Sequence, residues 1–110
     1  MKVIELAAKL GLKIVSGQSG INNEISTGYT SDLLSDVMGN VETGSVWITL
    51  QTHKNVMAIA SLKDLAAVVI VNNYVPDQDL LSQSEEEGIP VLTTSDKAFE
   101  ISAKIFNLLK

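Results

Sequence analysis

The chain contains no cysteine, a single histidine and few aromatic residues, which make up 5% of its 110 positions. Without cysteine it forms no disulfides, uses no thiol nucleophile and binds no metal through thiolates. One histidine, His53, excludes the usual histidine-rich zinc site within one chain, so we expect no metal. The low aromatic content predicts an aliphatic core. A cysteine-free chain suits a reducing compartment, so we expect a cytoplasmic protein.

Several functional motifs are also missing. The sequence has neither the Gly-x-x-x-x-Gly-Lys-Ser/Thr phosphate loop nor the Gly-x-Gly-x-x-Gly dinucleotide motif, and no serine lies in a nucleophile-elbow context. The net charge of −5, with few and scattered lysines, disfavours the basic surface that nucleic acid requires. No apolar run reaches the length of a membrane span, and Glu5 comes too early for a signal peptide. We therefore expect neither a nucleic acid nor a membrane partner.

Three unbroken apolar runs, at 45–50, 66–71 and 89–92, each end in a cluster of small polar residues. Apolar runs without alternation are typical of parallel strands that are covered on both faces. Segments with helical periodicity separate them, which requires crossover connections. With 45% apolar residues in 110, the sequence predicts one α/β domain over residues 1–110, with a mostly parallel sheet built from βαβ units.

The remaining expected elements follow from periodicity and turn residues. A first helix ends at Gly11, and a strand follows at 13–16. The later part reads as strand 45–50, helix 54–64, strand 66–71, helix 77–87, strand 89–93 and helix 96–109. A short strand is expected at 24–26. The segment 29–38 stays open, with Ser31 as a candidate cap of a short helix.

The polar strand ends predict a ligand site, because the carboxyl ends of parallel strands meet at one edge of a sheet. Their neutral donors and acceptors suit a nucleotide or another small polar metabolite, and an adenine nucleotide is the candidate class. The alternative interpretation is that these residues only cap helices and turn the chain. The candidate ligand-binding residues are Ser31, Asp32, Asp36, Gln51, Thr52, His53, Asn72, Asn73, Thr94 and Ser95.

A catalytic interpretation is the main rival. His53 would act as a general base oriented by Asp32, on a phosphorylated or acidic metabolite. This requires His53 and a carboxylate to converge in one cleft. Asp32 and Asp36, one helical turn apart, would also suit Mg²⁺, but the better explanation is that Asp32 stabilises a helix start and Asp36 is solvated. The turn Gly17–Gly20 resembles a phosphate-binding turn but lacks a lysine.

A third interpretation is a pure protein-interaction module without a small ligand. The stretch 29–38 carries Leu33, Leu34 and Met38, and Tyr74 lies in a later loop. Exposed apolar side chains of this kind favour burial against a partner. This interpretation predicts a broad apolar surface for self-association and no enclosed polar pocket.

Two blocks of the sequence resemble a known family. They are Gly-Tyr-Thr-Ser-Asp-Leu-Leu-Ser-Asp at 28–36 and Trp-Ile-Thr-Leu-Gln-Thr-His at 47–53, and Ala-Ser-Leu-Lys-Asp-Leu-Ala at 60–66 extends the likeness. On these residues the chain resembles a stand-alone DRTGG-domain protein over nearly its whole length. The five letters that name the family do not occur here in order. Only Ser26, Thr27 and Gly28 are similar to them, so no residue role is transferred from that motif.

The resemblance implies a fold like that of the amino-terminal domain of HPr kinase/phosphorylase and of the first domain of Mur ligases. It also implies a non-catalytic regulatory or ligand-sensing module that forms a homodimer and works with a partner protein of a metabolic or redox system. Small relatives carry an HPr serine kinase label. This chain lacks the phosphate loop that a kinase of that kind needs, so we expect no enzyme and no bound cofactor.

Overall fold

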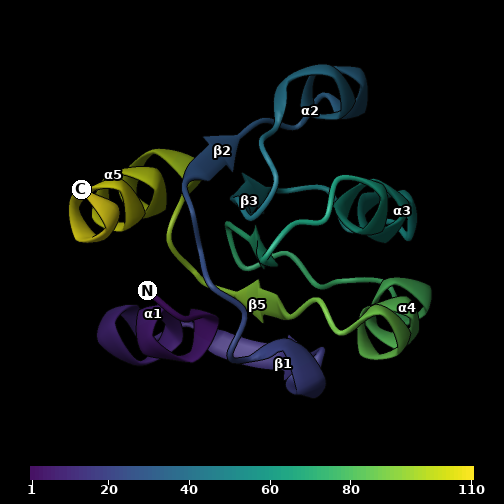
Figure 1. Ribbon diagram of the computed structural model, residues 1–110, viewed down its shortest axis with the longest axis horizontal. Helices are drawn as coiled ribbons and strands as arrows, with labels where there is room; N and C mark the ends of the chain where they lie inside the picture. Colours follow the sequence, from purple (N-terminus) through teal and green to yellow (C-terminus); the bar gives the residue numbers. More distant parts are fainter.

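The computed structural model describes residues 1–110 and has a central five-stranded sheet with helices on both faces (Figure 1). The strands are β1 (Lys13–Ser16), β2 (Gly28–Thr30), β3 (Val46–Thr49), β4 (Ala67–Ile70) and β5 (Val91–Thr93). The helices are α1 (Val3–Leu10), α2 (Leu34–Asn40), α3 (Asn55–Leu62), α4 (Gln78–Glu87) and α5 (Ala98–Leu109), with a 3-10 turn at Gln18–Gly20.

The strand order is β1-β5-β4-β3-β2, and β2 to β5 are parallel while β1 is antiparallel to β5. Each crossover from β2 through β5 steps to the next strand in the same direction. Because such crossovers share one hand, α2, α3 and α4 lie on one face, and α1 and α5 lie on the other (Figure 1). The predicted α/β class with a mostly parallel sheet is confirmed.

The core lies on both sides of β3 and β4, whose residues are all buried. Side chains alternate, so Val46 and Ile48 face α1 and α5 while Trp47 faces α3. Trp47 is the one aromatic side chain in an otherwise aliphatic core, as the composition predicts. Its Nε1 donates a hydrogen bond of 2.9 Å to the carbonyl of Ser31, which fixes the end of β2 against β3. None of the helices is long and apolar enough to cross a membrane.

Two sequence predictions between residues 24 and 40 are wrong. The expected strand at 24–26 is absent, because its backbone bonds to loops: Ile25 N donates to Met1 O and Ser26 N to Gly44 O. The strand forms at Gly28–Thr30 instead. Ser31 does not cap α2, which begins at Leu34; its Oγ accepts a 3.2 Å hydrogen bond from Leu33 N and shapes the turn before the helix.

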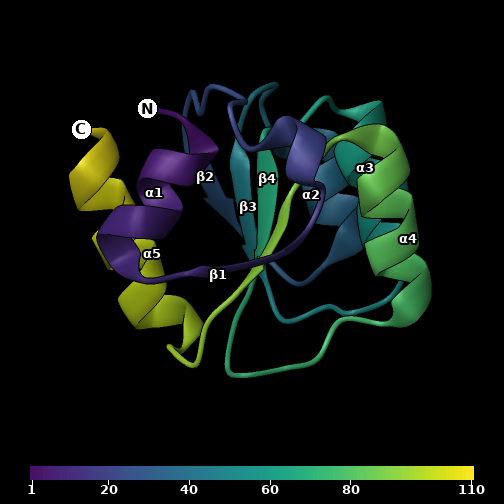
Figure 2. The ribbon, with the colours of Figure 1, turned by 90° about the horizontal axis from the view of Figure 1, so that it is seen from below.

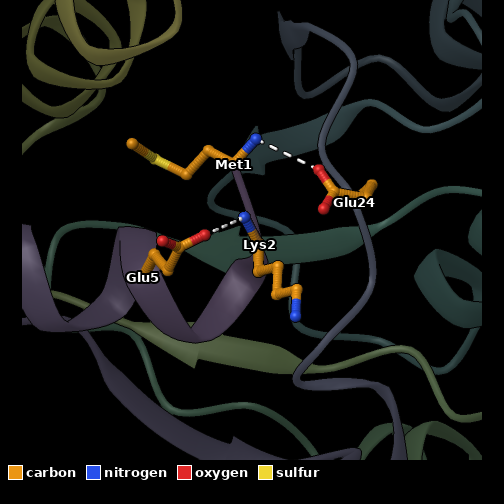
Figure 3. A network of polar contacts seen from close by, with 4 residues as sticks. All are labelled: Met1, Lys2, Glu5 and Glu24. Carbon is orange, nitrogen blue, oxygen red and sulfur yellow. Dashed lines mark hydrogen bonds and ion pairs between the residues drawn. The ribbon is translucent and has the colours of Figure 1, made fainter.

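The start of α1 is held by a capping bond of its own and by contacts with the loop that leads to β2 (Figure 3). Lys2 N donates to Glu5 Oε1 at 2.8 Å, and the amino group of Met1 lies 3.1 Å from Glu24 Oε2. Lys2 and Glu24 also form an isolated β-bridge. These contacts fix the loop beside α1, so the chain enters β2 from a defined position.

Candidate functional site

The four parallel strands end at one edge of the sheet, which we call the carboxyl edge and define by the loops 31–33, 50–54, 71–77 and 94–97. In Figure 2 the loops after β3, β4 and β5 lie together below the strands. The parallel register places the ends of β2 to β5 side by side, as the sequence predicts. All the predicted site residues lie on these loops except Asp36, which lies in the first turn of α2.

Asp32 joins the end of β2 to the end of β3. Its Oδ1 accepts hydrogen bonds from Thr49 Oγ1 and from Leu50 N, both at 2.9 Å. Its carbonyl accepts a further bond of 2.9 Å from Gln51 Nε2. Two predicted residues, Asp32 and Gln51, therefore contact each other directly. The bonds of Asp32 to Thr49 and Leu50 occupy its Oδ1 and hold the loops after β2 and β3 together.

Asn72 and Asn73 join the end of β4 to the loop after β5. Both have left-handed backbones, with φ of 62° and 61°, a conformation that asparagine tolerates better than most residues. Their N–H groups donate to Asp96 O at 2.8 Å and to Thr94 O at 2.9 Å. With the backbone groups used in this way, both side chains point out of the loop and are exposed.

The remaining predicted residues differ in which of their hydrogen-bonding groups already have partners within the chain. Thr94 Oγ1 accepts from Asp96 N at 3.1 Å, and Thr52 O accepts from Asp77 N at 3.0 Å. The side chain of Ser95 is exposed. The carboxyl edge is thus a hydrogen-bonded frame that presents a few neutral side chains to solvent.

His53 is exposed and acts on its own helix. Its Nδ1 accepts a 3.2 Å hydrogen bond from Asn55 N, which helps to begin α3. No hydrogen bond or ion pair joins His53 to Asp32 or Asp36. The catalytic interpretation requires that pair, so the geometry does not favour it.

Asp36 interacts with β2 rather than with Asp32. It accepts hydrogen bonds from Tyr29 Oη at 2.9 Å and from Asn40 Nδ2 at 3.1 Å. The pKa of Asp36 is lowered below its ordinary value, mainly by a hydrogen bond from the side chain of Ser31 and next by the bond from Tyr29. The same bond to the carboxylate raises the pKa of Tyr29. Asp32 and Asp36 therefore have separate partners, and the chain has no cluster of three or more metal-ligating side chains.

Two lysines at the carboxyl edge were missed by the sequence reasoning. Lys54 precedes α3 and Lys97 precedes α5, both are exposed, and neither forms an ion pair. Lys104 differs, because its Nζ bonds to Asp96 Oδ2 at 2.8 Å. The signal was available in the sequence, since both lysines directly follow the polar clusters that mark the strand ends. They add positive charge to an edge whose own loops also carry Asp32, Asp77 and Asp96, of which Asp96 pairs with Lys104 and Asp32 bonds to Thr49 and Leu50.

The glycine-rich turn binds a carboxylate of its own chain. Gly17 N and Gln18 N both donate to Glu85 Oε1 of α4, at 2.5 Å and 3.4 Å. These are the N–H groups that a phosphate would need. The turn therefore serves to attach the end of β1 to α4.

Neither of the two hollows in the molecule lies at the carboxyl edge. One, of about 570 Å³, lies between β2 and α5. The other, of about 380 Å³ and mostly polar, lies at the opposite edge around Gly44, Asp64 and Gly88. The first hollow was not predicted from the sequence, although both phenylalanines of the chain, Phe99 and Phe106, border it.

A model of the DRTGG domain matches residues 5–108. The chain belongs to the DRTGG domain family. Among solved structures, it is similar to the CBS and DRTGG domains of the regulatory region of Clostridium perfringens pyrophosphatase, complexed with the activator diadenosine tetraphosphate. The TM-score is 0.69 at 10% identity, over 96% of this chain and 45% of that one, so the likeness shows the shared fold. No curated protein matches.

The family match confirms the resemblance read from the sequence. The more specific likeness to HPr kinase/phosphorylase and to Mur ligases stays a prediction, as does the role of each residue at the carboxyl edge. This DRTGG domain spans less than half of the Clostridium perfringens chain, at 45%.

Proposed function

We propose that this DRTGG domain is a non-catalytic regulatory module of the cytoplasm that senses a small polar ligand and works as a homodimer. An adenine nucleotide is the proposed ligand class. Family membership supports the regulatory role, as does the fold likeness to a regulatory region that was solved with an activator nucleotide. In this role the ligand changes how the domain contacts a partner protein of a metabolic or redox system.

The observation that carries the proposal is the set of uncommitted groups at the carboxyl edge. The side chains of Asn72, Asn73 and Ser95 are exposed on a frame whose backbone is already satisfied. Amides and hydroxyls of this kind suit the polar edges of a base and a ribose. Lys54 and Lys97 lie beside them without ion-pair partners, and they attract phosphates.

The test compares diadenosine tetraphosphate with adenosine, which has no phosphate, by calorimetric titration and thermal unfolding of the full chain. A ligand at about 100 times its dissociation constant adds about 2.7 kcal/mol to the free energy of unfolding. The proposal predicts stabilisation by the tetraphosphate and a much weaker effect of adenosine.

Two variants locate the site. Asn72→Gly with Asn73→Gly removes both amides and keeps residues that accept a positive φ. Lys54→Gln with Lys97→Gln removes the two free charges. Both are expected to weaken binding about tenfold or more. Lys63→Gln, at the far end of α3, is the matched charge control and is expected to bind like the wild type.

Equal binding by all variants would mean that the carboxyl edge is not the site. Absence of any shift with adenine nucleotides would overturn nucleotide sensing and favour the interaction module without a small ligand. The hollow between β2 and α5 supports that second candidate, because it is the apolar surface that such a module requires.

A further inference from the structure

The hollow between β2 and α5, which we call the α5–β2 groove, is bordered by a free sheet edge. β2 is the last strand of the sheet and hydrogen-bonds only to β3. Figure 1 shows α5 over one face of β2, with no further strand beyond it. Thr30 Oγ1 and Ser102 Oγ, 2.8 Å apart, connect the strand to the helix across the groove.

The outer backbone groups of β2 are available for another strand. Thr27 O accepts from Val46 N, and Ser31 N donates to Ile48 O, so these two residues face β3. Because backbone groups alternate along a strand, Tyr29 also faces β3, and the N–H and C=O groups of Gly28 and Thr30 point outward.

Helix α5 has a second apolar face besides the one that packs on the sheet. Ile101 and Ile105 are buried in the core. Phe99 and Phe106, seven residues apart and therefore on one side of the helix, are 85% and 67% exposed. They are the only phenylalanines of the chain. A protein that places both of them in water on one helix face has a surface typical of an interface.

The charge and area of this surface favour a second copy of the chain as the occupant. Two copies with a net charge of −5 repel each other, so they meet best where charge is scarce, and Lys110 is the only charged residue in the groove lining. The exposed parts of the two rings offer about 300 Å². A small specific interface needs about 600 Å² per partner, and the edge of β2 with the neighbouring lining residues extends the surface toward that area.

The edge is also complementary to itself. If two copies meet about a two-fold axis beside Tyr29, Gly28 of one protomer faces Thr30 of the other in an antiparallel pair. Residues facing each other in this way exchange both backbone hydrogen bonds. The same axis brings the two α5 helices together, and their phenylalanines become buried.

We propose that the α5–β2 groove is the homodimer interface, in which two β2 strands join two five-stranded sheets into one. This inference rests on the proposed function, because it names the surface through which the proposed homodimer forms. It differs from the sequence expectation, which placed self-association at Leu33, Leu34, Met38 and Tyr74. Leu33 and Met38 are indeed exposed, so the two surfaces can be compared directly.

The test is the molar mass of the full chain by sedimentation velocity, over a concentration series from about 1 µM to about 200 µM. The wild type is expected to be a dimer at the upper end. Phe99→Ala with Phe106→Ala is expected to raise the dissociation constant about 100-fold or more. Thr30→Pro removes one outward N–H and is expected to act in the same direction. Leu33→Ala with Met38→Ala is the matched control and is expected to remain dimeric.

The outcomes separate the two proposals. If both the wild type and the phenylalanine variant are dimers, the proposed interface is wrong and the proposed homodimer stands. If only the Leu33 and Met38 variant dissociates, the surface predicted from the sequence is the interface. If the wild type is monomeric at every concentration, both the proposed homodimer and this interface are overturned. Unchanged circular dichroism of the phenylalanine variant shows that it is folded, so its mass is interpretable.

Discussion

The carboxyl edge and the α5–β2 groove share β2, yet they differ in whether their groups have partners within the chain. At the carboxyl edge, Asp32, Asn72 and Asn73 use carboxylate or backbone groups in bonds within the chain. In the groove, two phenylalanine rings and the outer backbone of β2 face water. A cluster of polar residues therefore does not by itself mark a free binding surface; only those members without internal partners, such as the side chains of Asn72, Asn73 and Ser95, remain available to a ligand.

The largest effect on the free energy of unfolding is expected from removing a hydrogen bond that holds the carboxyl edge. Trp47→Phe deletes the Nε1 donor to Ser31 O and leaves space in a fully buried position. We expect a loss of about 2–4 kcal/mol in the free energy of unfolding, from an unpaired carbonyl and a cavity. Urea denaturation measures it. A loss below about 1 kcal/mol would show that the end of β2 does not depend on this bond.

Asp32→Ala is expected to have the next largest effect, because it leaves Thr49 Oγ1 and Leu50 N without their acceptor. The expected loss is about 1–2 kcal/mol, measured in the same way. Asp32→Asn keeps a side-chain oxygen that accepts both bonds and is the matched control. If Asn destabilises as much as Ala, the negative charge rather than the acceptor geometry holds the two loops together.

Tyr29→Phe is expected to have a smaller effect that depends on pH. The pKa of Asp36 is lowered, so its contribution is present above about 3.8 and is lost as the pH falls through the folded-state pKa. The pKa of Tyr29 is raised, so its contribution is present below about 10.0 and is lost as the pH rises through the folded-state pKa.

The difference in thermal midpoint between wild type and Tyr29→Phe is therefore expected to be constant near neutral pH and to shrink toward both extremes. Tyr74→Phe, at an exposed loop position, is the matched control. A difference between wild type and Tyr29→Phe that stays the same from neutral pH to a pH below the folded-state pKa of Asp36 would mean that the bond does not favour the ionised carboxylate.

The smallest effect on stability is expected in the groove. Phe99→Ala with Phe106→Ala removes rings that pack on little within the protomer, and alanine favours the helix. At about 1 µM protein, where association is least, the free energy of unfolding is expected to change by less than about 1 kcal/mol. A larger loss would show that the rings belong to the fold of a single protomer.

Most of the fold could be predicted from the sequence, because each apolar run has the length of a strand and each helix its own period. β2 could not be predicted in this way. It has three residues, and Tyr29 is its only partly buried side chain, so no alternation marks it. Its position depends on pairing with β3, which is a contact between segments distant in the sequence.

The position of the candidate site could be predicted from the sequence, but the hydrogen bonds that its residues make could not. The strand ends could be recognised from their polar clusters, but the bonds of Asp32 to Thr49 and Leu50 exist only once β2 and β3 are paired. The groove escaped notice for a related reason. The helical spacing of Ala98, Ile101 and Ile105 places these residues on the sheet and leaves Phe99 and Phe106 off that stripe, but the hollow beside the two rings depends on where β2 pairs.

The central claim concerns backbone groups in two places. At the carboxyl edge they hydrogen-bond within the chain, whereas the outward N–H and C=O groups of β2 bond to a second copy of the chain. Amide hydrogen exchange, resolved by residue and measured at low and high protein concentration, tests both halves at once. The account predicts that Leu50, Asn72 and Asn73 exchange slowly at both concentrations, and that Gly28 and Thr30 become protected only at the high one. Fast exchange of Gly28 and Thr30 at both concentrations, in a chain that is dimeric at the higher one, would contradict it.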